Sequence, residues 1–374
     1  MANLYIHYPF CKQACYYCNF HFSTATKSRD SVWMAIQKEF DLRKGEMLHP
    51  LESIYFGGGS PSLLDPKQLF AFIKKIKKEC TVVDAVEITI EVNPDDVSAE
   101  YLQALKNAGI NRLSVGIQSF HQPELSLMNR AHDSNQALEA IALIREEFSN
   151  FSIDLIYGMP YSTTQSWEEN INKILAFDPP HISAYALTVE PKTVLQSYVK
   201  SKKIKLLDEE LVKAQYDLLI QIMNQKEYIN YEFSNFGKPG FFSVNNQNYW
   251  TGKPYLGIGP SAHSYDGIRK RSWNIYNNHL YMDSISKGVL PQETEFLKTK
   301  DCFNEYIMTG LRTWTGVSLE HIKNIFGEQY ASYLESQVNQ HLEQNNLFWD
   351  GDNLKITQKA KFLTDGIAAD LFML

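Results

Sequence analysis

The chain has 374 residues, a formal net charge of −7 and a sequence pI near 5.8. Hydrophobic residues make up 44% of it and charged residues 21%, which is ordinary globular composition and excludes a disordered chain. The acidic balance excludes a general surface for nucleic acid or anionic membranes, which would need a basic excess. The start of the chain has no secretory signal, and no apolar run of about 18 residues could span a bilayer. We therefore expect a soluble, cytoplasmic protein.

Three of the five cysteines stand together, directly after a short apolar run at residues 4–10. Cys11, Cys15 and Cys18 have the spacing C-x3-C-x2-C, and a tight loop with three thiolates can hold three irons of a [4Fe–4S] cluster. The fourth iron is then open to a further ligand. Because Cys80 and Cys302 lie far away along the chain, the set does not suit a disulfide framework and indicates a reducing compartment.

Structural zinc is the alternative occupant of the three thiolates. Such a site normally has four protein ligands, so His7 or His21 would have to complete it. A zinc-binding scaffold is therefore kept as a hypothesis beside the iron–sulfur cluster. A brown chromophore that is lost on Cys11→Ala would exclude it.

Strand-like and helical segments alternate along residues 1–230, which we assign to one domain. The predicted strands span residues 4–10, 53–56, 86–91, 112–118, 152–157 and 181–187. The predicted helices, the third of them closed by Gly109 as a C-cap, span residues 31–44, 65–78, 98–107, 134–148, 164–177 and 206–224. This alternation predicts a parallel sheet with right-handed crossovers. Six units favour an α/β fold of the open, partial (β/α)6 TIM-like barrel type.

A covering segment, residues 231–294, follows the predicted barrel. Its first part, residues 231–262, is rich in glycine, asparagine and aromatic residues. This composition favours a structured loop over regular elements, because glycine permits tight backbone turns. Such loops often carry ligand specificity.

Residues 295–374 have the pattern of a small, mainly helical C-terminal domain that resembles a winged helix. We predict helices at 302–311 and 329–343, a hairpin at 347–356, and helices capped by Ser318 and Thr357. Residues 300–374 carry six lysines and arginines against ten aspartates and glutamates, a net charge of −4. An interaction or lid domain is therefore favoured over DNA binding, which needs cations that neutralise phosphates.

Polar and glycine residues collect where the predicted parallel strands end. The cysteine loop follows the first strand, and the triple glycine at residues 57–59 follows the second. Glu91, Gln118 and Asp154 are polar residues in otherwise apolar strands, where burial is costly without partners. Because ligands bind at the carboxyl ends of parallel strands, we expect these residues to share one site.

The types of these residues indicate the ligand of the open iron. Gly58 and Gly59 would let a ligand's ammonium group approach backbone carbonyls, and Ser60 adds a hydroxyl. Arg130 can hold a carboxylate through two parallel hydrogen bonds. Acceptors for ribose hydroxyls or an amine are offered by Glu91, Gln118 and Asp154. An amino acid joined to a nucleoside satisfies all of these.

These motifs resemble those of the radical S-adenosylmethionine (radical SAM) proteins, by the C-x3-C-x2-C motif and the glycine-rich loop after the second strand. Over essentially the whole chain, further motifs resemble the group that contains the anaerobic coproporphyrinogen III dehydrogenases (HemN) and the HemW heme chaperones. These motifs are Tyr5-Ile-His-Tyr-Pro-Phe-Cys11, Phe56-Gly-Gly-Gly-Ser-Pro-Ser62, Glu91-Val-Asn-Pro94, Ser114-Val-Gly-Ile-Gln-Ser119 and Asp154-Leu-Ile-Tyr-Gly-Met-Pro160.

The resemblance implies that Cys11, Cys15 and Cys18 hold the cluster and that S-adenosylmethionine chelates its fourth iron. One-electron reduction, from a donor such as a flavodoxin, would cleave the sulfonium C–S bond to give methionine and a 5′-deoxyadenosyl radical, chemistry that the cofactor supplies. The positions that match the family's cofactor-binding residues are Tyr5, Tyr17, Gly58, Gly59, Ser60, Glu91, Gln118, Arg130, Asp154 and Ala186.

One position after the cysteines bears on the choice within the group. The dehydrogenases typically continue the third cysteine as C-x-C, whereas Cys18 is followed here by Asn19 and Phe20, as in the chaperones. The first hypothesis is therefore a HemW-like protein that binds the cluster, S-adenosylmethionine and heme and delivers heme to acceptor proteins. The second is an enzyme, an oxygen-independent coproporphyrinogen III dehydrogenase that converts propionates to vinyls by radical oxidative decarboxylation.

A second motif bears on heme itself. The chaperones' H-N-x-x-Y-W motif corresponds here to Asn245-Asn-Gln-Asn-Tyr249-Trp250, so the histidine expected to bind heme iron is an asparagine. Its amide is a poor ligand for heme iron. Candidate replacements in the possible heme or porphyrin region are His263 and Cys302.

Overall fold

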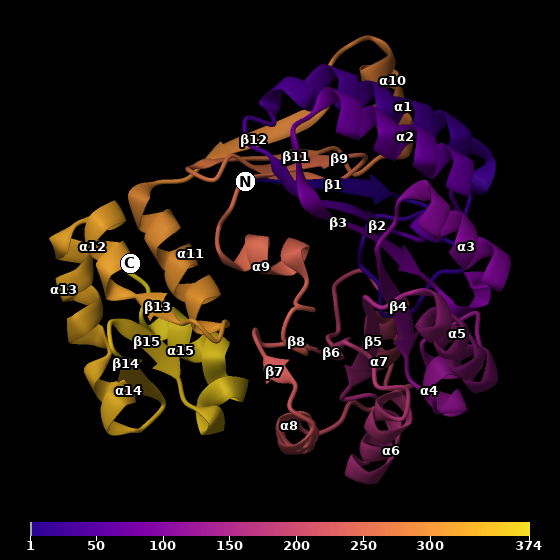
Figure 1. Ribbon diagram of the computed structural model, residues 1–374. Helices are drawn as coiled ribbons and strands as arrows, with labels where there is room; N and C mark the ends of the chain where they lie inside the picture. Colours follow the sequence, from indigo (N-terminus) through magenta and orange to yellow (C-terminus); the bar gives the residue numbers. More distant parts are fainter. Residues whose placement is uncertain (1) are drawn as a thin grey trace.

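The computed structural model describes residues 2–374 and has a twelve-stranded sheet at its centre (Figure 1). Six consecutive strands lie side by side and parallel, which confirms the predicted partial (β/α)6 barrel. They are β1 (Ala2–Tyr8), β2 (Leu51–Gly58), β3 (Val82–Val92), β4 (Arg112–Gln118), β5 (Phe151–Tyr157) and β6 (His181–Ala186).

The helices that follow these strands cover the outer face of the barrel, from α1 and α2 at the top of Figure 1 to α6 and α8 at the bottom. The predicted ones are α1 (Arg29–Arg43), α2 (Pro66–Glu79), α3 (Ala99–Ala108), α5 (Ser134–Glu147), α6 (Thr164–Leu175) and α8 (Glu209–Gln225). Gly109 caps α3 with a left-handed φ of 94°, as predicted. In α2, apolar residues at positions i, i+3, i+4 and i+7 are buried against the sheet: Leu69, Phe72, Ile73 and Ile76. Two short helices were not predicted, α4 (Gln122–Leu127) and α7 (Val194–Lys200).

The expectation of an irregular loop at residues 231–262 was wrong, because this segment and the next extend the sheet. After β7 (Ile229–Asn230) and β8 (Asn235–Gly237), which add to the β6 edge, the chain forms α9 (Val244–Trp250). The other edge gains β9 (Tyr255–Ile258), β10 (His263–Tyr265), β11 (Lys270–Asn274) and β12 (Gln292–Phe296), with α10 (Asn278–Ser286) between the last two. Strand β9 runs parallel to β1, so pairing with a distant strand overrides weak local propensity.

A buried ion pair fixes this sheet extension to α1. Arg43 Nη1 donates to Glu39 Oε1 at 3.0 Å and to the Gly257 carbonyl at 3.1 Å. The other oxygen of Glu39 accepts hydrogen bonds from the Gly259 amide at 2.8 Å and from Tyr281 Oη at 2.5 Å. Both charges of the pair are therefore compensated, and strands β9 and β10 are held in one position against the barrel.

The C-terminal residues form a second hydrophobic core, on the left of Figure 1. Its elements are α11 (Thr299–Leu311), β13 (Val317–Ser318), α12 (Leu319–Phe326), α13 (Glu328–Gln337), α14 (Asn339–Glu343), β14 (Leu347–Asp350), β15 (Asn353–Ile356) and α15 (Thr364–Asp370). The hairpin and the Ser318 cap are confirmed, since Ser318 Oγ accepts from the His321 amide at 3.1 Å. None of the helices in residues 2–374 is both long and apolar enough to cross a bilayer.

Two predictions for this domain were wrong. The single helix at 329–343 is two helices, because the chain turns at Val338 and so brings that side chain into the core with Leu334. Thr357 does not cap the last helix: its hydroxyl donates to the Asn345 carbonyl at 2.9 Å and so closes the base of the hairpin.

Candidate functional site

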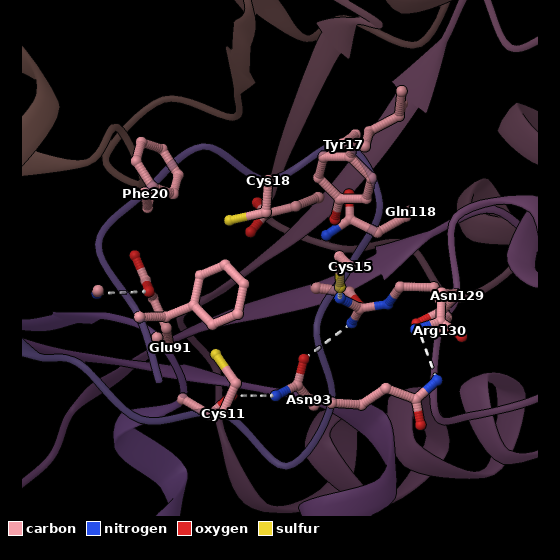
Figure 2. Close-up of a pocket in the computed structure, with 18 of the residues that line it drawn as sticks. Cys11, Cys15, Tyr17, Cys18, Phe20, Glu91, Asn93, Gln118, Asn129 and Arg130 are labelled. Carbon is pink, nitrogen blue, oxygen red and sulfur yellow. Dashed lines mark hydrogen bonds between the residues drawn. The ribbon is translucent and has the colours of Figure 1, made fainter. Parts of the chain in front are cut away.

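A cavity of about 620 Å³ opens at the carboxyl ends of the six parallel strands. This is the end where parallel α/β sheets place their ligands. The structure brings the three cysteines together there with all but one of the residues predicted to bind the cofactor (Figure 2). The predicted residues that line the cavity are Cys11, Cys15, Tyr17, Cys18, Gly58, Gly59, Ser60, Glu91, Gln118, Arg130, Asp154 and Ala186.

Tyr5 is the predicted cofactor residue that lies behind the cavity wall. It is stacked on Tyr55, with ring centroids 6.0 Å apart, and its hydroxyl is 3.1 Å from His7 Nδ1. Tyr55 does line the cavity and donates a hydrogen bond to Glu91 at 3.0 Å. Tyr5 therefore supports a wall residue that was not predicted from the sequence.

The cysteine loop is fastened to the segment between α4 and α5. The Tyr16 amide donates to the Met128 carbonyl at 3.1 Å, and Asn129 Nδ2 donates to the Ala14 carbonyl at 2.7 Å. In return, Gln13 Nε2 donates to the Asn129 carbonyl at 3.0 Å (Figure 2). Asn129 has a left-handed φ of 56°, which asparagine tolerates better than most residues. These bonds hold the cysteine loop at the cavity mouth.

The environment of the thiols suits metal ligation. Burial raises the pKa of Cys11 to about 12 and that of Cys18 to about 11, so these thiols hold their protons until a metal displaces them. Arg130 Nη1 donates to Cys15 Sγ at 3.3 Å, so a positive charge lies beside the third thiol. The fourth ligand of a zinc site is not offered by His7, whose ring nitrogens lie 3.1 Å from Tyr5 Oη and 2.9 Å from the His21 carbonyl.

The two glycines after β2 are required by the neighbouring strand. Gly58 has a φ of 113°, and a Cβ there would lie 2.8 Å from the His7 ring. A Cβ on Gly59 would lie 2.6 Å from the Phe10 carbonyl oxygen, next to Cys11. The predicted reason for the two glycines was that they let a ligand's ammonium group approach the backbone carbonyls. In the structure the missing side chains let the glycine loop pack against the start of the cysteine loop.

We expect Gly59→Ala to lower both stability and cluster occupancy. The methyl group would press on the backbone of Phe10, which cannot rotate away, and such overpacking costs about 1–3 kcal/mol. Gly45→Ala is the matched control, because a Cβ at Gly45 meets nothing within 4 Å. Urea denaturation and iron content after reconstitution measure the two effects. Equal values for the two variants would contradict this packing argument.

Two carboxyl groups line the cavity wall at β3 and β5. Glu91 accepts from Tyr55 Oη at 3.0 Å and from the Gly58 amide at 3.2 Å, and burial raises its pKa to about 7. Burial also raises the pKa of Asp154, although Ser114 donates to it at 2.9 Å. Two buried carboxyls with raised pKa values are suited to a ligand that brings a positive charge and hydroxyl groups.

Arg130 lies across the cavity from these carboxyls. Its Nη2 donates to Asn93 Oδ1 at 2.8 Å and to the Gly116 carbonyl at 2.7 Å, while Asn93 Nδ2 donates to Ser60 Oγ at 2.9 Å. The predicted bidentate grip on a carboxylate would therefore require the guanidinium group to leave these partners. The part played by Asn93 was missed, although its place directly after β3 is a signal for a strand-end site.

Gln118 ends β4 in a left-handed conformation with a φ of 70°. Such a backbone is uncommon for glutamine and clusters at functional sites. The pairing of β4 with β5 is irregular between Gly116 and Gln118, and this turns the Gln118 side chain toward the cavity (Figure 2).

The residues predicted for heme lie at two ends of one sheet face. Asn245 is 3% exposed at the amino ends of the strands, where Asn3 Nδ2 donates to its carbonyl at 3.4 Å. His263 lies at the carboxyl end beyond β9 and is exposed. Tyr249 packs on Tyr255 with ring centroids 4.6 Å apart, and Trp250 stacks on Arg312. The structure therefore does not bring Asn245 and His263 into one contact site.

Comparison with known proteins agrees with this geometry. Residues 5–174 match the radical SAM superfamily. The heme chaperone HemW of Bacillus subtilis is 35% identical over 90% of this chain and 88% of the relative, and that of Synechocystis is 34% identical over 88% and 82%. The chain belongs to the HemN/HemW group of radical SAM proteins. Coproporphyrinogen III oxidase (HemN) of Escherichia coli has the same fold, with a TM-score of 0.84 at 22% identity over 100% of this chain and 90% of that one.

Membership of the radical SAM superfamily implies a [4Fe–4S] cluster and S-adenosylmethionine. The donor set fits both groups. Three thiols of one loop face the cavity from its mouth, and carboxyl, amide and guanidinium groups line the wall behind them (Figure 2).

Proposed function

We propose that this protein is a heme chaperone, which holds a [4Fe–4S] cluster and S-adenosylmethionine, binds heme and delivers it to acceptor proteins in the cytoplasm. The observation that carries the proposal is the identity of 35% to a heme chaperone, which extends across 90% of the chain and so includes the C-terminal domain. A one-electron donor such as a flavodoxin would serve the cluster.

Each part of the cavity has a role in this proposal. Cys11, Cys15 and Cys18 hold the cluster, and the bound S-adenosylmethionine supplies radical chemistry when it receives an electron. Glu91 and Asp154 accept hydrogen bonds from the amine and ribose of the cofactor. Arg130 places its positive charge beside Cys15, and Tyr17, Gln118 and Ala186 shape the remaining wall.

Phe20 occupies the position at which the chaperone motif differs from the dehydrogenase motif. It lines the cavity rim and is 69% exposed, in the position where the dehydrogenase pattern has a fourth cysteine. An exposed phenyl ring at the rim offers a flat apolar surface and no metal-binding or acid–base group. This position therefore supports heme handling over radical decarboxylation.

The test combines transfer and turnover. Reconstituted protein loaded with hemin is expected to pass it to apomyoglobin, as followed by the Soret band, faster than free hemin aggregates release it. The same protein, given coproporphyrinogen III, S-adenosylmethionine and dithionite under anaerobic conditions, is expected to leave the porphyrinogen unchanged. Formation of protoporphyrinogen IX, or failure to bind hemin, would overturn the proposal.

A further inference from the structure

The sheet extension presents one face that carries aromatic side chains and a single histidine. Paired residues of antiparallel strands lie on the same face, and β10 pairs with β11 and β9 so that these side chains come together. We call this surface the aromatic face, and it consists of Tyr255, His263, Tyr265, Arg271 and Trp273. Figure 1 shows β9 and β11 above α9, and this face contacts both α9, through Tyr249 and Tyr255, and α11, through Arg271 and Glu305.

Successive rings contact one another along the aromatic face. His263 stacks on Trp273 with centroids 5.9 Å apart and an interplanar angle of 28°. Tyr265 lies 6.2 Å from Tyr255, and Arg271 stacks on Tyr265 at 5.8 Å. The opposite face of the same strands is buried against α1, whereas His263 is exposed and the other side chains of the aromatic face are partly exposed.

His263 is the histidine of this face, and imidazole is an established axial ligand of heme iron. Its side chain is accessible to solvent, while neighbouring groups partly desolvate the ring. This partial desolvation and the charge of Arg271 lower the pKa of His263, which favours a neutral imidazole. Nε2 lies 2.9 Å from Tyr276 Oη. Tyr276 is itself 57% exposed. It can rotate away so that Nε2 of His263 binds the iron, or it can keep its hydrogen bond and orient the imidazole while Nδ1 binds the iron.

We propose that heme, the cargo of the proposed function, binds on the aromatic face with His263 as an axial ligand of its iron. This inference rests on the proposed function and names the site of its cargo. Three adjacent strands span about 10 Å, comparable to a porphyrin macrocycle. Trp273 and Tyr265 would provide flat apolar contact, and Arg271, which forms an ion pair with Glu305 of α11, is the cation of this face that a propionate would meet.

The alternative site at α9 is poorly suited to heme. Asn245 is enclosed by Asn3, Ser53 and Glu87, because its carbonyl accepts from Asn3, its amide donates to Glu87 at 3.3 Å and its side chain accepts from Ser53 at 3.4 Å. A bulky ligand would have to displace three buried polar contacts. The His263 side chain makes one hydrogen bond, with an exposed tyrosine.

The aromatic face also lies next to the cofactor cavity. Tyr5 stacks on Tyr55 of the cavity wall, and its strand position pairs with Gly257 of β9, two residues after Tyr255. His7 joins Tyr5 to His21, whose ring lies 6.2 Å from that of Tyr276. A series of ring and hydrogen-bond contacts therefore connects the cavity wall with His263.

The test is a titration of reconstituted full-length protein with hemin and, separately, with metal-free protoporphyrin IX. His263→Ala is expected to weaken hemin binding by roughly tenfold or more, which corresponds to about 1.4 kcal/mol, and to shift the Soret band. The same variant should bind protoporphyrin IX like the wild type. Trp273→Ala, which keeps the imidazole, should weaken both ligands. His279→Ala, an exposed histidine on α10, is the matched control and should bind hemin normally.

Circular dichroism and iron content establish that each variant keeps its fold and cluster. If His263→Ala binds hemin with the affinity and Soret band of the wild type, the inference is wrong while the heme chaperone proposal stands. The inference is also wrong if hemin affinity changes in Asn245→His but not in His263→Ala. If the wild type binds no hemin, the chaperone proposal itself fails.

Discussion

Cys15→Ala is expected to abolish the iron–sulfur cluster. Its thiol lies beside Arg130 at 3.3 Å, and two remaining thiolates, Cys11 and Cys18, cannot hold three irons of a [4Fe–4S] cluster. After anaerobic reconstitution, the variant should lack the brown thiolate-to-iron charge-transfer absorbance and should contain almost no iron or sulfide. Because S-adenosylmethionine needs the open iron, its binding should fall with the cluster.

The remaining two cysteines provide matched controls for this result. Cys80 lies at the end of α2 and Cys302 on α11, and both are outside the cavity. Cys80→Ala and Cys302→Ala should keep full iron content and absorbance. Full iron content in Cys15→Ala would show that another side chain holds the cluster, and zinc in place of iron in the wild type would revive the scaffold hypothesis.

The parts of the fold predicted correctly depend on local pattern. The barrel strands and helices each bury their own apolar stripe, and Gly109 ends α3 by its own backbone preference. Strands β9 to β12 could not be found this way. They contain four, three, five and five residues, and they exist because β9 pairs with β1, some 250 positions earlier in the chain. Such distant pairing leaves little local signal in the sequence.

The candidate site shows the same division between features with a local sequence signal and features that depend on distant contacts. The residue types at the strand ends indicated which side chains would meet, and the cavity brings nearly all of them together. Their partners depend on spatial neighbours. Arg130 contacts Asn93 and Cys15, and Gly59 avoids the backbone of Phe10. A sequence pattern indicates the chemical type of each side chain. Which neighbouring group becomes its hydrogen-bond or packing partner depends on the three-dimensional packing.

Glu91→Gln is expected to weaken S-adenosylmethionine binding and, at the same time, to stabilise the ligand-free protein above neutral pH. The carboxylate is the proposed acceptor for the cofactor's amine or ribose, and a hydrogen bond to a charged group contributes about 1.5–3 kcal/mol. The dissociation constant should therefore rise roughly tenfold to a hundredfold. Calorimetric titration of reconstituted protein measures this. Glu52→Gln is the control, since Glu52 pairs with Lys253 at the opposite ends of the strands.

The stability effect follows from the raised pKa of Glu91. Burial raises this pKa from 4.5 to about 7, so the folded protein binds the proton more tightly than the unfolded chain. The contribution of Glu91 to the free energy of unfolding is then highest below pH 4.5 and falls between pH 4.5 and 7, by roughly 3 kcal/mol. Because glutamine carries no charge, the Glu91→Gln variant should lack this decrease in the free energy of unfolding. Urea midpoints of both proteins at about pH 5 and pH 8 measure the difference.

The same ionisation links cofactor binding to pH. A cationic ligand group favours the charged form of Glu91, so wild-type affinity for S-adenosylmethionine should increase as the pH rises through about 7. The Glu91→Gln variant should have weaker affinity that changes less over this range. Parallel pH profiles for both proteins would assign the titration to another group, with Asp154 next to be replaced because its pKa is raised by the same burial. In that case the raised pKa of buried Glu91 would make no contribution to cofactor binding.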